Sequence, residues 1–129
     1  MKNNFFILLI FFIFFKPLYA ENLNIKSLNI SIDKNTKLTI FKDDVVATDS
    51  KNNIFKSEYA EYDKNLKLLK SKGETTIITS EGYILKGKNI LFDNKNNLIV
   101  SNDPAVINDL EKNNIFLENF EYLVKDNLF

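Results

Sequence analysis

The sequence predicts an all-β fold, and three observations support that class. Apolar and polar residues alternate along short segments such as Leu28–Ile32, comparable alternations return every thirty residues, and turn-forming residues separate them. Period-2 alternation places apolar side chains on one face of a strand. A fixed period of this size is typical of stacked repeat architectures. We therefore expect a β-structure built from repeats of about thirty residues, each with two strands and two turns.

Residues 1–20 are predicted to form a signal peptide rather than part of the fold. The run Phe5–Phe15 is apolar without interruption, and Ala20 precedes the polar Glu21. As a helix such a run spans about 16 Å, against the roughly 30 Å of a bilayer core, so it suits a signal peptide better than a membrane anchor. Because Leu18 stands where a small residue is preferred, a retained N-terminal anchor is the alternative.

Residues 21–129 are expected to form one small domain, since 129 − 20 leaves 109 residues. Without the two lysines of the first segment, 17 − 2 = 15 lysines face 17 acidic residues, a net charge of −2. That balance offers no attraction to nucleic acid. Cysteine is absent, so an exported domain of this kind has to be stable without disulfides.

The strands predicted first are those whose apolar residues share even numbers. The pairs Ala60/Tyr62, Ile90/Phe92 and Phe120/Tyr122 repeat the alternation of residues 28–32. Because thirty is even, we expect every unit to present its even-numbered residues to the interior. The predicted inward residues are Leu28, Ile30, Ile32, Leu38, Ile40, Tyr62, Leu68, Ile78, Ile90, Phe92, Leu98, Phe120 and Tyr122. Odd-numbered apolar residues, including Phe41, Phe55, Leu69 and Ile99, are expected to contact neighbouring turns or solvent.

The turns are predicted from aspartates that close each alternating segment. Asp33, Asp63 and Asp93 lie thirty residues apart, and a second series of turn signals begins at Asp49, Thr79 and Asp109. Aspartate side chains bond their own backbone and favour tight turns. A calcium-binding ladder formed by the first three aspartates is the alternative, although calcium-binding β-rolls have shorter, glycine-rich repeats.

No residue pattern indicates catalysis. The chain has no His, Cys or Arg, and its three glycines cannot form a phosphate-binding loop. The adjacent acids Asp43 and Asp44 align with Gly73-Glu74 and Asp103-Pro104 at expected turn positions. We predict that the protein is not an enzyme and has no cofactor or metal.

The C-terminal end departs from the pattern. Leu123 stands where the next turn aspartate is expected, Asp126 arrives late, and the last residues include the apolar pair Leu128 and Phe129. These features predict a repeat array that is incomplete at its C-terminus and pairs with a partner or continues in a longer protein.

The residues from Phe55 to Asn97 resemble the OstA-like periplasmic domain family of lipopolysaccharide transport. The shared elements are Tyr62-Asp63, Leu68, the segment from Gly73 to Ile77, and Gly82. The resemblance extends over residues 24–125.

The resemblance implies a V-shaped antiparallel β-jellyroll that is open at both ends and has no catalytic residue. Members of this family, which includes LptA, LptC and the N-terminal domain of LptD, hold lipopolysaccharide acyl chains inside and join edge to edge. By that resemblance, the predicted inward residues are candidates to line a lipid groove. The implied partners are lipopolysaccharide and other jellyroll domains of the transport system.

Two versions of this function are expected, and a different class remains open. The chain resembles either an LptA-like bridge or the N-terminal domain of an LptD-like translocon, with an outer-membrane barrel in the same longer chain. Both versions place it in the periplasm, the second one attached to the outer membrane. The alternative is a structural or adhesive exported β-repeat protein that binds no lipid.

Overall fold

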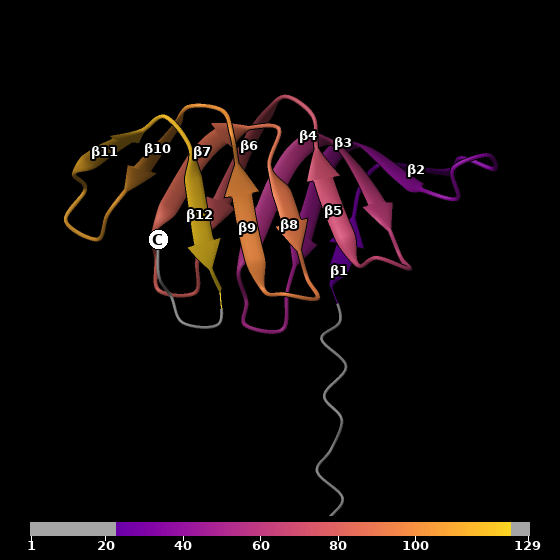
Figure 1. Ribbon diagram of the computed structural model, residues 1–129, viewed down its shortest axis with the longest axis horizontal. Coiled ribbons are helices and arrows are strands. Elements are labelled where there is room, and N and C mark those ends of the chain that lie inside the picture. The colour runs from indigo at the N-terminus through magenta and orange to yellow at the C-terminus, as the bar shows by residue number, and fades with distance from the viewer. Residues whose placement is uncertain (1–22, 125–129) are drawn as a thin grey trace, which may run out of the picture.

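The structure, a computed structural model, describes residues 23–124, and every regular element in that range is a β-strand (Figure 1). The predicted all-β class is confirmed. The predicted signal peptide (residues 1–20) and the last residues (125–129) lie outside the described range. The twelve strands are β1 (Asn24–Lys26), β2 (Asn29–Ile32), β3 (Thr39–Thr48), β4 (Ile54–Asp63), β5 (Leu68–Ser71), β6 (Glu74–Ile78), β7 (Ile84–Lys88), β8 (Leu91–Asp93), β9 (Leu98–Ser101), β10 (Ala105–Asn108), β11 (Asn114–Leu117) and β12 (Phe120–Leu123).

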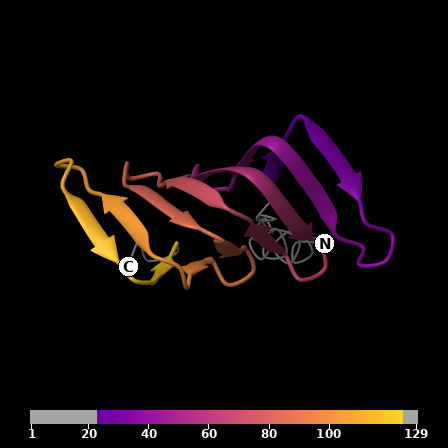
Figure 2. The same ribbon diagram turned by 90° about the horizontal axis from the view of Figure 1, so that it is seen from above.

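All the strands belong to one antiparallel sheet that folds over on itself. The two long strands β3 and β4 change partners along their length. The first part of β4 pairs with β6 and its last part with β5, while β3 pairs with β2 and then with β1. The result is a first half-sheet in the order β1-β3-β4-β6-β7-β10-β11 and a second half-sheet in the order β2-β3-β4-β5-β8-β9-β12. Figures 1 and 2 show the two half-sheets connected by corners along one side.

The core lies between the two half-sheets and draws on both. Ile77 and Leu85 come from the first half-sheet, and Leu69 and Phe92 from the second. All four side chains are buried in a single apolar cluster. The inner faces of the two half-sheets therefore cover each other over the middle of the molecule.

Two kinds of corner decide which residues face inward. At the first kind, successive buried positions are four residues apart, as in Ser71 to Thr75, so odd-numbered residues stay inward. At the second kind, they are three apart, as in Ser57 to Ala60, so the inward parity changes from odd to even. Even-numbered residues consequently face the core side in β2, in the last part of β4, in β8 and Ile90 just before it, and in β12 and Val124 just after it.

The prediction that even-numbered residues face inward throughout is therefore wrong in part. Ile40, Leu68, Ile78 and Leu98 alternate with the buried residues Phe41, Leu69, Ile77 and Ile99, so they face outward. Leu38 precedes β3 and is half-buried against the same outer surface. The odd-numbered residues Phe41, Phe55, Leu69 and Ile99, expected near turns or solvent, belong to the core.

Structural features return at the thirty-residue spacing seen in the sequence. Left-handed backbone occurs at Lys37, Lys67 and Asn97, and again at Asn52, Gly82 and Lys112. These residues lie in the hairpin turns. The segment between residues 63 and 93 contains four short strands, β5 to β8, where the sequence predicts two. The difference arises because each expected strand bends at a corner and is divided there.

Candidate apolar groove

The middle of the inner face is packed. Ile90, Phe92, Phe120 and Tyr122, all predicted to line a groove, are buried between the half-sheets. Tyr62 is half-buried and contacts the same cluster. At these positions side chains from the opposite half-sheet already fill the space that an acyl chain would occupy.

The inner face is uncovered at the N-terminal end of the molecule. Ile30 of β2 pairs with the buried Phe41, and Ile32 pairs with Thr39. Directly opposite residues of an antiparallel pair point to the same side, so Ile30 and Ile32 lie on the core side of the sheet. Leu28, Ile30 and Ile32, which we call the N-terminal row, are nevertheless 73%, 59% and 68% exposed.

The inner face is also partly uncovered at the C-terminal end of the molecule. Ile115 of β11 pairs with the buried Ile107 and is 46% exposed, while Leu117 is half-buried against the core. Phe116 points to the outer face and is 76% exposed. Apolar inner surface thus continues beyond the packed middle at both ends.

Each end of the molecule also has strands with an unpaired edge. Over residues 23–124, β1 and β2 pair only with β3, β11 pairs only with β10, and β12 pairs only with β9. An unpaired edge presents free backbone N–H and C=O groups to other strands. These four edges and the uncovered inner residues beside them form the candidate site.

The mouth opposite the corners is bridged by polar contacts between the half-sheets. The Lys51 ammonium donates a hydrogen bond to the carbonyl of Val124, and the Tyr122 hydroxyl lies 3.4 Å from a Glu81 carboxylate oxygen. Burial, with the nearby Glu81 charge, raises the pKa of Tyr122 to about 12. Burial also raises the pKa of Tyr62. Both phenols are therefore neutral at physiological pH, so they add no charge to the inner surface.

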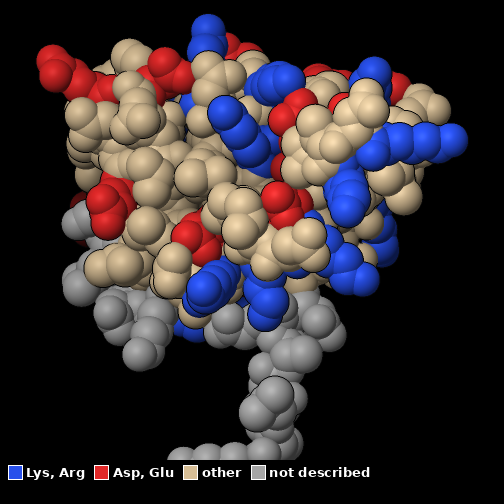
Figure 3. Space-filling view, turned by 45° about the vertical axis from the view of Figure 1, so that its right-hand side comes forward, with Lys and Arg blue, Asp and Glu red and all other residues tan. Residues whose placement is uncertain are grey.

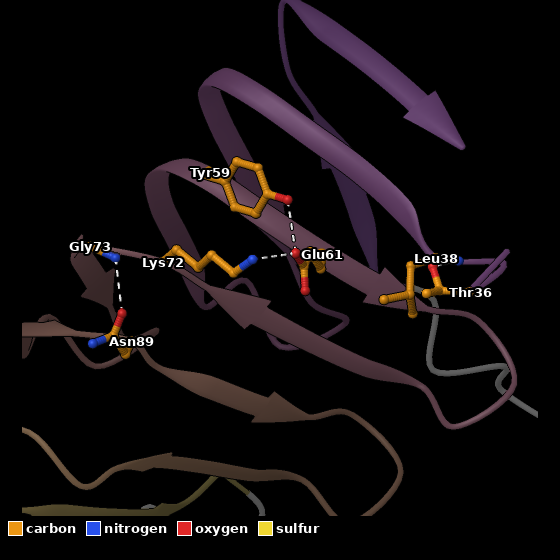
Figure 4. A network of polar contacts seen from close by, with 7 residues as sticks. All are labelled: Thr36, Leu38, Tyr59, Glu61, Lys72, Gly73 and Asn89. Atoms are coloured by element: carbon orange, nitrogen blue, oxygen red, sulfur yellow. Dashed lines mark hydrogen bonds and ion pairs between the residues drawn. The ribbon is translucent and has the colours of Figure 1, made fainter. Parts of the chain in front are cut away.

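The outer face of the second half-sheet has a polar cluster beside a corner (Figure 4). The carboxylate of Glu61 accepts hydrogen bonds from Lys72 at 2.6 Å and from the Tyr59 hydroxyl at 2.8 Å. The Lys72 ammonium also lies 4.9 Å from the centre of the Tyr59 ring. The Lys72 hydrogen bond, and then the Tyr59 one, hold the pKa of Glu61 below its ordinary value, and Glu61 in turn raises the pKa of Lys72.

This cluster predicts a pH-dependent stabilisation. Because the folded-state pKa of Glu61 is depressed, its contribution is present above the unfolded value near 4.5 and is lost as the pH falls through the folded value. A Lys72→Gln variant should be less stable than wild type at pH 7, and urea unfolding should show that difference shrinking as the solution is acidified. The matched control Lys56→Gln, on the outer face of the first half-sheet, should show no such convergence. A constant Lys72→Gln difference from pH 7 to pH 3 would contradict the prediction.

The turn aspartates are used by the backbone. Asp33 accepts the N–H groups of Asn35 and Thr36, and Asp63 and Asp93 accept the corresponding pairs in their own turns. Asp49 and Asp109 make similar bonds in the second series of turns. No group of three potential metal ligands lies together within residues 23–124. These hydrogen bonds explain the aspartates as turn-forming residues, which is the first of the two roles considered for them, the other being a calcium-binding ladder.

The outer surface has shallow hollows and no dominant charge. A hollow of about 190 Å³ contains Leu38, Leu68 and Leu91 on the outside of the second half-sheet, so two predicted groove residues lie there instead. A larger one of about 500 Å³, beside the corner of β3, includes Lys56, Glu58 and Glu74. Figure 3 shows lysine and acidic side chains interspersed over one face of the molecule.

A scan against protein-family models finds no match, and a search of curated proteins finds none either. In the part of the chain that the structure describes, no helix is long and apolar enough to cross a membrane.

Proposed function

We propose that this protein carries lipopolysaccharide through the periplasm as a V-shaped β-jellyroll of the OstA-like type. In this role it binds acyl chains on its apolar inner face and joins other jellyroll domains edge to edge. The main support is the N-terminal row, where Ile30 and Ile32 extend the core side of the sheet into solvent and Leu28 is exposed just before them. Signal-directed export of the chain from Glu21 onward belongs to the same proposal.

The energetics favour a lipid ligand for such a surface. Burial of an acyl chain contributes about 0.8 kcal/mol per CH₂ group, so a carrier that covers only part of each chain still gains substantial affinity. Isoleucine and leucine side chains supply apolar contact without any polar group that would lose hydration. Ile30 and Ile32 lie on the core side of β2, so a bound chain would continue the packed interior outward.

The architecture supports the edge-to-edge part of the proposal. The half-sheets are connected by corners along one side, as the two arms of a V-shaped jellyroll would be. Strands with one unpaired edge stand at both ends of the molecule. Addition of a partner strand to such an edge is a common mode of recognition. Both a short LptA-like bridge and the N-terminal domain of an LptD-like translocon would use these edges.

One observation favours the alternative of a structural or adhesive β-repeat protein. The middle of the inner face is filled by side chains, among them Leu69, Leu85 and Tyr122, each with 0% exposure. The contacts of Lys51 and Glu81 across the mouth also oppose separation of the half-sheets. A lipid carrier of this form would hold acyl chains at its ends, or would have to open in the middle.

A photo-crosslinking experiment separates the two functions. A photoreactive residue at Ile30, exposed on the inner face, should capture lipopolysaccharide in cells, because an acyl chain on that face contacts it. The matched control is Ser31, which is also exposed but points to the outer side of the same strand. Equal capture at both positions would indicate nonspecific contact. No capture at Ile30 would favour the structural protein.

The same probe at Phe92 reports on the middle of the molecule. Phe92 is buried between the half-sheets, so lipid reaches it only when they separate. Capture at Ile30 without capture at Phe92 would restrict the bound chain to the end of the molecule. Capture at both positions would show that the interior opens during transport.

A further inference from the structure

The N-terminal edge has the features of a surface that pairs with itself. β2, with the sequence Asn29-Ile30-Ser31-Ile32, contains no charged residue. Edge strands of soluble proteins commonly avoid association through lysine, proline or other charged residues. Among the other edge strands of the described range, β1 contains Lys26 and β12 contains Glu121, whereas β11 is also uncharged. β2 therefore lacks the usual protection while carrying two exposed isoleucines on its core side.

The strand directions favour like ends meeting. Each half-sheet has seven strands joined by six antiparallel pairings, so the strands at its two edges run in the same direction. Head-to-tail stacking of copies would consequently place β12 beside β2 in parallel orientation. Two copies of β2 related by a two-fold axis instead meet antiparallel, which continues the pairing of the rest of the sheet.

The N-terminal row is complementary to itself under that symmetry. Leu28 and Ile32 lie two residues on either side of Ile30. In the antiparallel register that places Ile30 opposite Ile30 of a second copy, Leu28 lies opposite Ile32 in both directions. Side chains directly opposite in such a pair have Cβ atoms about 4.5–5.5 Å apart. Every member of the row then has an apolar neighbour, and only uncharged Asn29 and Ser31 meet on the outer side.

We propose that the protein forms a two-fold dimer through antiparallel pairing of β2 strands, with Ile30 facing Ile30 across the axis. The dimer joins the inner faces of two copies into one apolar surface and leaves the C-terminal edge of each copy free for a different partner. Pairing of the two β2 edges covers the side of the row that faces the second copy. The surface of the row that belongs to the inner face of the sheet stays accessible. The dimer therefore forms whether or not the inner face holds a lipid.

Charge substitution at the axis tests the dimer in the purified protein by analytical ultracentrifugation. Wild type should sediment as a dimer, and Ile30→Lys should weaken dimerisation by about a hundredfold, because two lysines would face each other. Ile30→Glu should do the same. An equimolar mixture of the two variants should regain the dimer, which a merely unfolded variant could not do. The control Ile115→Lys, on the exposed inner face at the other end, should remain dimeric.

A disulfide test gives an independent result, because the chain contains no cysteine. Under oxidation, Ile30→Cys should form a covalent dimer, since paired strands bring the two Cα atoms within disulfide range. Ile115→Cys should not. A monomeric wild type, or dimerisation lost in Ile115→Lys and kept in Ile30→Lys, would overturn the proposal. Neither readout involves lipid, so failure of the dimer is distinguishable from failure of lipid capture at Ile30.

Discussion

Replacement of Phe92 by alanine is expected to lower the free energy of unfolding by about 3–5 kcal/mol. The ring of Phe92 is 3% exposed and belongs to the apolar cluster between the half-sheets. Truncation removes the buried ring atoms and leaves a cavity, because the two facing sheets cannot collapse fully around the gap. Urea unfolding followed by circular dichroism measures the change.

The neighbouring residue supplies the control for this substitution. Leu91 precedes Phe92 on the same strand, points to the outer face and is only half-buried. Leu91→Ala should therefore cost clearly less than Phe92→Ala. Losses of similar size would contradict the assignment of inner and outer faces on β8. A loss below about 1 kcal/mol for Phe92→Ala would show a site open to solvent or lipid instead of a packed core.

Ser71→Ala is expected to destabilise the fold by about 1–3 kcal/mol, although it removes a single oxygen atom. The Ser71 hydroxyl is fully buried at a corner, where its oxygen accepts the backbone N–H of Ile90 at 2.8 Å and the hydroxyl of Thr75 at 2.7 Å. Alanine would leave the Ile90 N–H buried without that acceptor. The cost of such an unsatisfied donor exceeds the net contribution of an ordinary hydrogen bond.

Hydrogen exchange would locate this effect. The amide of Ile90 should lose protection in Ser71→Ala beyond the change in global stability, because its own acceptor is gone. Ser31→Ala is the matched control, since Ser31 is exposed on β2. Unchanged exchange of the Ile90 amide relative to the rest of the core would refute the role assigned to Ser71.

The alternation in the sequence predicts where strands lie better than which side they bury. The segment 28–32 was expected to form a strand, and β2 occupies Asn29–Ile32. Its residues are exposed because β2 lies at an end of the molecule, and alternation within one segment contains no information on what covers it. Tertiary position, rather than local pattern, decides the burial of Ile30.

The corners account for the largest error in the candidate site. A parity rule assumes an unbroken strand, and the three-residue corner between Ser57 and Ala60 reverses parity within β4. A signal for this was present, because Ala47, Ile77 and Ile107 also recur at thirty residues with odd numbers. Within one thirty-residue unit, apolar residues thus recur at odd positions as well as at even ones. This combination indicates that the side of the strand facing inward changes along the chain.

The corners also determine which changes in chain length the fold can accommodate. A deletion of one residue between Ser57 and Ala60 would leave them two residues apart, the spacing of an unbroken strand, and would remove the extra residue that forms this corner. Thirty residues added as a complete set of strands and corners would preserve every facing and lengthen each half-sheet by two strands, or about 10 Å. Viable insertions and deletions among descendants of this chain should therefore cluster in the hairpin turns or come in whole thirty-residue steps.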